Sequence, residues 1–262
     1  TQALVEERLD QQAAQLIAGR GDACEARWVA RAQTDAQLEL RTACLDQRQR
    51  ELDATVDTLA SGERETLEHA VELLDGLGDV GMCEQVDLLE RGWLVAKDAA
   101  TAAKVVVLRD RIAHAHALRL ASDVAGAKLV VGEIASEVEA LDYGPLRAEL
   151  LYLRGRLEQR EEKFDAARES LLEAATLAEE VGHVELAPSA WINLSMVERG
   201  RDAKQAPERS IEHVMAKRAL RRIRAAPSDM RWHQLAYASA YRLINADQAA
   251  RAVKVIDESL DE

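Results

Sequence analysis

The three cysteines of this 262-residue chain could form a disulfide, and their spacing favours one pair. Cys24 and Cys44 each stand ten residues from Thr34. The Thr34-Asp35 pair is typical of a turn followed by a helix N-cap. If the helices on either side form an antiparallel hairpin, the two thiols lie side by side, and we hypothesise a Cys24–Cys44 bridge with Cys83 left free. The alternative is that they are small buried thiols that pack like hydrophobic residues.

Two other patterns are typical of cofactor sites, and both have a simpler interpretation. The string from Gly76 to Gly81 reads GLGDVG and matches GxGxxG. That motif binds a dinucleotide only between a strand and a helix, whereas an amphipathic helix precedes it here, so we interpret it as a loop that ends this helix. The six histidines lack the spacing of a metal site, and no Ser-His-Asp or Cys-His arrangement can be assembled. We therefore expect no catalytic residue, metal or cofactor in this chain, and no enzyme activity.

One cluster of cations stands out in a chain whose net charge is −13. It lies near the end of a predicted helix and comprises Lys217, Arg218, Arg221, Arg222 and Arg224. Cations near a helix C-terminus suit the helix dipole, so the cluster is either a solvated helix face or a docking site for an acidic partner segment. The overall charge argues against a nucleic-acid partner, because a polyanion would approach against the field of the whole protein.

The elements that must position these residues are helices. Good helix formers dominate, 48% of the residues are hydrophobic, and there are only four prolines. We therefore predict an all-α fold. No run of 18 apolar residues occurs, so we expect no membrane span. Residues 1–92 read as an N-terminal helical section with a long antiparallel hairpin, in which Gly19 and Gly21 are expected to interrupt the first helix.

Residues 93–262 contain a repeat with a period of 41 residues. At this shift Leu150, Trp191 and Trp232 fall in one column. A second column, three positions later, contains Leu153, Leu194 and Leu235. A fixed period of this length indicates stacked helix pairs, and we expect about four of them.

The repeat resembles the tetratricopeptide repeat, whose helix A carries a large residue, a leucine and then a small residue. The best copy contains Leu150, Leu153 and Leu157 on helix A and Phe164, Ala167, Leu171 and Ala174 on helix B. Arg154 stands where a small residue is expected, and Gly155 comes one place late. In a later copy the helix B positions are taken, at less regular spacing, by Ile211, Val214, Met215, Ala219 and Ile223. The resemblance implies a right-handed α-solenoid of helix hairpins.

In tetratricopeptide solenoids the A helices line a concave surface that binds a peptide or a protein. The resemblance therefore implies a ligand groove lined by Ile192, Asn193, Met196, Arg199, His233, Tyr237 and Tyr241. The alternative is that a neighbouring helix covers these residues.

The N-terminal section has a narrower resemblance. It looks like the region that precedes the repeats in bacterial serine/threonine-protein kinases. The segments that carry this resemblance are Cys24 to Trp28, Leu38 to Arg48, and Cys83 followed by an acidic and apolar run. The resemblance implies a non-catalytic interaction and sensor region joined to a kinase domain before Thr1, with ATP and Mg²⁺ bound only there. It favours the extracytoplasmic face of a membrane-anchored kinase. The alternative function is a structural self-association module that forms a homodimer without a separate ligand.

Overall fold

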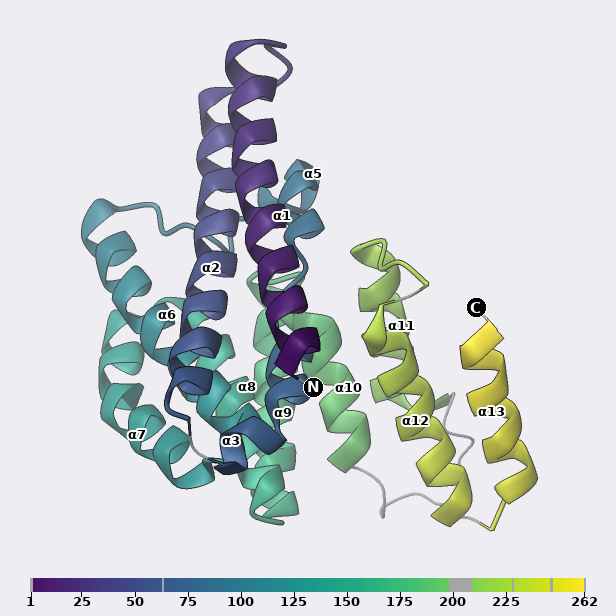
Figure 1. Cartoon of the computed structure of the whole chain (residues 1–262). Coiled ribbons are helices and arrows are strands. Elements are labelled where there is room, and N and C mark those ends of the chain that lie inside the picture. The colour runs from purple at the N-terminus through teal and green to yellow at the C-terminus, as the bar shows by residue number, and fades with distance from the viewer. Residues whose placement is uncertain (1, 63, 198–208, 228, 246, 262) are drawn as a thin grey trace. The chain divides into compact units, whose positions relative to one another are not determined.

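The computed structural model describes residues 2–62, 64–197, 209–227, 229–245 and 247–261. These residues form helices and turns with no strand, which confirms the all-α prediction (Figure 1). The contacts divide the chain into two compact units, residues 1–146 and residues 147–262. None of the described helices is long and apolar enough to cross a membrane.

The first unit begins with two long helices that run side by side, α1 (Gln2–Trp28) and α2 (Asp35–Ala60) (Figure 1). Thr34 caps α2: its side chain accepts a hydrogen bond from the Gln37 backbone N–H, and the Gln37 side chain accepts one from the Thr34 N–H. The prediction that glycines interrupt α1 is wrong. A Cβ at Gly19 would lie 3.0 Å from a Leu45 methyl group, so this glycine permits close packing of α1 on α2 within a continuous helix.

Shorter helices follow in the first unit: α3 (Arg64–Glu68), α4 (Ala70–Asp75), the 3-10 helix η1 (Val80–Glu84) and α5 (Val86–Leu89). A non-helical segment, residues 93–98, leads to α6 (Ala99–Leu120) and α7 (Val124–Leu141). α6 packs against both α2 and α7. One core cluster of this unit contains Ala54, Leu73, Ala113, Ala117 and Ala121. The sequence boundary at residue 92 groups α6 and α7 with the repeats. In the structure, the contacts of these two helices place them in the first unit.

The second unit contains most of α8 (Gly144–Arg160), followed by α9 (Phe164–Glu180) and α10 (Leu186–Val197). After residues outside the described ranges come α11 (Ile211–Arg222), α12 (Met230–Asn245) and α13 (Ala249–Asp261). α10 packs against α9, α11 and α12, and α12 packs against α13. A core cluster of Ala148, Ala178, Leu186, Ala187 and Ala219 joins α8, α9, α10 and α11.

The repeat columns lie at similar depths in the second unit. Leu153, Leu194 and Leu235 are only 1–3% exposed. In the other column Leu150 and Trp191 are buried and Trp232 is half-buried. A leucine that recurs every 41 residues therefore packs into the core each time, which is the behaviour expected of a repeated helix pair.

Gly155 takes the place of the missing small residue at Arg154. A Cβ at Gly155 would lie 2.7 Å from Leu171 Cγ, so this glycine allows α8 to approach α9 closely. Arg154 points outward instead and pairs with Glu158 at 2.9 Å. On α9 Ala167, Leu171 and Ala174 are buried as the repeat pattern predicts, whereas Phe164 is exposed.

Candidate functional site

α11 is the element on which the candidate site is built, and its start is defined by a cap. The Ser210 side chain accepts a hydrogen bond from the His213 backbone N–H at 3.3 Å. One side of the helix is buried, with Ala216, Ala219, Leu220 and Ile223 at most 2% exposed. These positions are three and four residues apart, so they form the stripe that packs against the rest of the unit.

Polar contacts at both ends fix the rotation of α11 about its axis. In its first turn, His213 Nδ1 lies 2.9 Å from Ser239 Oγ on α12. In its last turn, Arg222 Nη1 donates to Glu179 Oε2 on α9 at 2.6 Å, and both side chains are largely buried. The opposite side of α11 is consequently held toward solvent.

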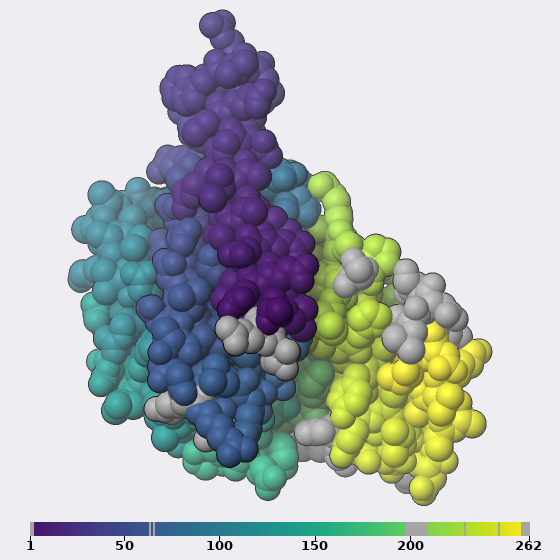
Figure 2. All heavy atoms as spheres, viewed as in Figure 1, coloured from purple at the N-terminus to yellow at the C-terminus, as the bar shows by residue number. Residues whose placement is uncertain are grey.

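That solvent side combines apolar and cationic residues, and we call it the basic face: Ile211, Val214, Lys217, Arg218 and Arg221. All five are exposed, Ile211 by 64% and Val214 by 49%. The expected burial of Ile211 and Val214 is therefore wrong. The helix is rotated so that Ala216 and Leu220 take the inner positions instead. Figure 2 shows the atoms of the lime-green α11 region at the surface in this view.

The cations of the basic face lack partners in the described part of the chain. Lys217, Arg218 and Arg221 make no ion pair or hydrogen bond with any described residue. Of the cations grouped with them by sequence, Arg222 instead points inward to Glu179. A hollow of about 320 Å³ lies on the face, lined by His213, Val214, Lys217, Arg218 and Arg221. Carboxylate or phosphate groups of a partner could pair with its cations while apolar side chains contact Val214.

The basic face lies in the less acidic of the two units. Residues 1–146 contain 27 acidic and 15 basic side chains, a net charge of −12, whereas residues 147–262 contain 20 and 19, a net charge of −1. The second unit is thus nearly neutral, and it repels an acidic partner less than the first unit does.

The predicted groove is not open along α10. Ile192 is fully buried and Asn193 is 3% exposed. Asn193 Nδ2 donates to the Ser189 carbonyl at 2.7 Å and to the Tyr152 hydroxyl at 3.1 Å. Met196 is half-buried, and Arg199 lies outside the described residues. The physical reason is that α9, α11 and α12 all pack on α10, so the alternative of cover by neighbouring helices holds for Ile192 and Asn193.

The groove residues on α12 are more accessible. Tyr237 is 53% exposed, and its ring centroid lies 6.2 Å from that of Tyr241. His233 and Tyr241 are half-buried. Together with exposed Met230 and Ile244, seven residues to either side, Tyr237 forms an apolar stripe along α12. The structure therefore places three of the predicted groove residues, His233, Tyr237 and Tyr241, on α12, with Tyr237 exposed.

The cysteine hypothesis is corrected by the structure. Cys44 is bonded to Cys83, with Cα atoms 5.5 Å apart, and Cys24 is free and exposed. Equal distance from Thr34 places Cys24 and Cys44 at a similar level of the hairpin but not on facing sides. Leu16 and Ala23 occupy the buried side of α1, and Cys24 follows one position later, about 100° around the helix. Cys44 faces η1 instead, a contact between segments 39 residues apart that local spacing does not encode.

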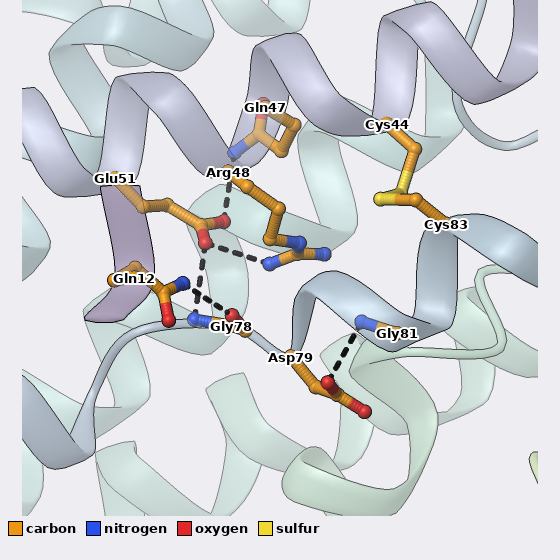
Figure 3. A network of polar contacts seen from close by, with 9 residues as sticks. All are labelled: Gln12, Cys44, Gln47, Arg48, Glu51, Gly78, Asp79, Gly81 and Cys83. Atoms are coloured by element: carbon orange, nitrogen blue, oxygen red, sulfur yellow. Dashed lines mark hydrogen bonds and ion pairs between the residues drawn. A yellow bond between two sulfur atoms is a disulfide. The ribbon is translucent and has the colours of Figure 1, made fainter. Parts of the chain in front are cut away.

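The first four residues of the glycine string, 76–79, form the loop between α4 and η1, and Val80 and Gly81 begin η1. No strand precedes the string among the described elements. Figure 3 shows how this loop is held against α2: the Gly78 N–H donates to Glu51 Oε2, which also accepts from Arg48 Nη1. Gln12 Nε2 of α1 donates to the Gly78 carbonyl at 3.0 Å. A Cβ at Gly78 would lie 1.6 Å from Arg48 Nη1, so the glycine permits this close approach. The Cys44–Cys83 bond holds the same segment one turn further along.

No group of three or more His, Cys, Asp or Glu side chains that could hold a metal occurs within the described ranges. His183, for example, is buried beside Glu149 at 3.1 Å, and its Nδ1 accepts the Leu186 N–H at the start of α10. Its local role is to hold α10 against α8. Comparison of the chain with protein-family models, curated proteins and solved structures finds no match.

Proposed function

We propose that this chain is a non-catalytic protein-interaction module and that its docking surface is the basic face of α11. The observation that carries the proposal is the set of three exposed cations, Lys217, Arg218 and Arg221, without partners among the described residues of an acidic chain. The tethers at His213 and Arg222 support it further, because they present this face in one fixed orientation.

The chemistry of the face indicates the kind of segment that it accepts. Exposed charge pairs contribute about 0–1 kcal/mol each, so three of them alone give weak binding. Apolar residues of the partner that cover Ile211 and Val214 would add a salt-independent contribution of about 25 cal/mol per Å² of apolar area buried. The partner is therefore an acidic protein segment with interspersed apolar residues.

The resemblance to kinase regulatory regions supports a more specific role. In this proposal the chain is the sensor region of a serine/threonine kinase whose catalytic domain lies before Thr1, and docking of a protein or peptide partner controls pairing of the kinase. ATP and Mg²⁺ would bind in that catalytic domain. The Cys44–Cys83 bond supports an extracytoplasmic location, because disulfides persist in oxidising compartments.

The test is binding of a fluorescent synthetic peptide that alternates glutamates with leucines, followed by anisotropy. We expect saturable binding that weakens as salt is added, and a loss of at least about tenfold in affinity in the variant K217E/R218E/R221E. The matched control, R154E/R160E/K163E, changes the net charge equally at exposed positions elsewhere in the second unit and should lose much less. Equal losses in the two variants would mean that only net charge matters and would reject a docking surface on α11.

A second candidate function is self-association without a separate ligand, and the apolar stripe on α12 favours it. Met230, Tyr237 and Ile244 are each more than half exposed and lie on one side of the helix. An exposed apolar stripe is typical of an interaction surface, and here its occupant would be a second copy of the chain. If this contact forms a homodimer, M230S/Y237S/I244S should be monomeric in sedimentation velocity, whereas K217E/R218E/R221E should remain dimeric.

A further inference from the structure

A second hollow, which we call the α2–α6 cleft, lies within the first unit. Its volume is about 310 Å³. One wall is the polar side of α2, with Glu39, Thr42 and Asp46 at helical spacing. The other wall is apolar and comes from the segment before α6 and from α6 itself, with Val95, Ala102, Val105 and Val106.

The cations of the α2–α6 cleft already have partners. Arg50 Nε lies 2.9 Å from Asp110 Oδ1. Arg109 is 4% exposed, and its guanidinium donates to the Leu94 and Trp93 carbonyls at 2.5 and 3.1 Å. These bonds hold the irregular segment 93–98 against α6 and so shape the apolar wall.

The carboxylates of the α2–α6 cleft are more available than its cations. Glu39 is exposed and has no ion pair or hydrogen bond with any residue in the described ranges. Asp46 pairs with Arg20 at 2.7 Å, but both side chains are more than 40% exposed, and such pairs exchange partners at little cost. The cleft consequently combines the Glu39 carboxylate and the exchangeable Asp46 carboxylate with an apolar wall, and it fits a cationic segment with apolar residues.

We propose that the α2–α6 cleft of one copy receives the basic face of α11 from a second copy of this chain. The inference rests on the proposed function, since it assigns an occupant to the same docking surface. Val214 and Ile211 would contact the apolar wall, and Lys217, Arg218 and Arg221 would meet Glu39 and Asp46. The two surfaces match in both charge and polarity, which is the complementarity that specific interfaces show.

The division of charge disfavours contact between two first units. Contact between two first units would bring net charges of −12 and −12 together, whereas contact of a second unit with a first unit brings −1 to −12. Charges within about 8–10 Å are incompletely screened at physiological salt, so the difference persists at the contact. Each copy offers one cleft and one basic face, and the contact can therefore close reciprocally as a dimer or continue as a chain.

The test is a charge swap followed by sedimentation velocity on the whole chain, over about a hundredfold range of concentration, because contacts of this size are transient. Wild type should associate in a concentration-dependent manner. K217E/R218E/R221E, with an acidic face, and E39K/D46K, with a basic cleft, should each associate at least about tenfold more weakly. An equimolar mixture of the two variants should regain association, because each then meets an oppositely charged surface. Unchanged circular dichroism spectra and melting temperatures would show that both variants are folded.

Two results would overturn the inference: a wild type that stays monomeric over the whole range, or a mixture that associates no better than the separate variants. Binding of the acidic peptide to the basic face in either case would leave the proposed function intact. Association that is lost only in M230S/Y237S/I244S would assign self-association to the α12 stripe instead. The inference and the proposed function therefore fail separately.

Discussion

Cys44 and Cys83 join α2 to η1 across 39 residues of sequence, and this bond should contribute strongly to the stability of the first unit. Closing a loop of this length stabilises a fold by about 4 kcal/mol through the entropy of the unfolded chain. We predict that C44S/C83S lowers the free energy of unfolding by roughly 3–4 kcal/mol, measured by urea denaturation.

The exposed Cys24 supplies the control for that prediction. C24S should match wild type within about 0.5 kcal/mol, because exposed substitutions away from special features change little. A reductant should lower the urea midpoint of wild type and of C24S and leave C44S/C83S unchanged. If C24S is destabilised and C44S/C83S is not, the assigned pairing is wrong.

Asp229 leads to a prediction about pH. Burial alone would raise the pKa of Asp229, but Arg231 contacts both carboxylate oxygens and its N–H donates to one, so the pKa lies below its ordinary value of 3.8. A lowered folded-state pKa gives stability that is present above the unfolded value and lost as pH falls through the folded one. D229N should therefore be less stable than wild type by about 1 kcal/mol at pH 7.

The difference between D229N and wild type should shrink below pH 4 and vanish once Asp229 is protonated in the folded state. Asparagine keeps the shape and an acceptor oxygen at the start of α12, so the variant isolates the charge. Thermal melts at a series of pH values measure the difference. A gap that stays constant from pH 7 to the acid limit would contradict the role of ionised Asp229.

At the scale of elements, Gly155 should control the distance between α8 and α9. A methyl group there would meet Leu171, including its backbone nitrogen at 3.2 Å, so the helices would have to separate. We predict that G155A destabilises by about 1–2 kcal/mol, since overpacking costs more than the helix propensity that alanine adds.

Gly132 of α7 is the matched control, because it is also inside a helix but a Cβ there would meet nothing within 4 Å beyond the local backbone of its own helix. G132A should stabilise by roughly 0.5–1 kcal/mol. Urea midpoints of the two variants measure both effects. A G155A variant as stable as G132A would show that α8 and α9 do not touch at this glycine.

Much of the element scale could be predicted from the sequence, because helix propensity, caps and periodicity are local. The Thr34 cap and the buried leucines at 153, 194 and 235 follow from such signals. The rotation of α11 could not be predicted, because Ile211 and Val214 fit an apolar stripe as well as Ala216 and Leu220 do. Two contacts decide which stripe is buried: Arg222 with Glu179 and His213 with Ser239. Both join residues that are far apart in the sequence.

The candidate site could be predicted only in part, for the same reason. The cation cluster is visible in the sequence, but which of its members point outward depends on the rotation of α11. The groove residues Ile192 and Asn193 were expected at a surface, and the number of helices that pack on α10 decides that they are buried. Sequence spacing shows which residues share one side of a helix, but it does not show whether another helix packs on that side.

At the scale of the whole molecule, the negative charge is concentrated in residues 1–146. The exposed cations of the basic face lie in residues 147–262. This separation allows one chain to carry both an acidic surface and a surface that binds acidic segments. It also predicts that docking weakens steeply with salt, because the attraction acts between exposed groups.

Docking on the basic face is tested most sharply by NMR, with amide shifts of the whole chain followed during titration with the acidic peptide. We expect the largest shifts to cluster in residues 211–224, around Lys217, Arg218 and Arg221, and to disappear in K217E/R218E/R221E. Shifts that cluster on α12 or scatter over both units, or a triple variant that shifts as wild type does, would contradict a docking surface on the basic face.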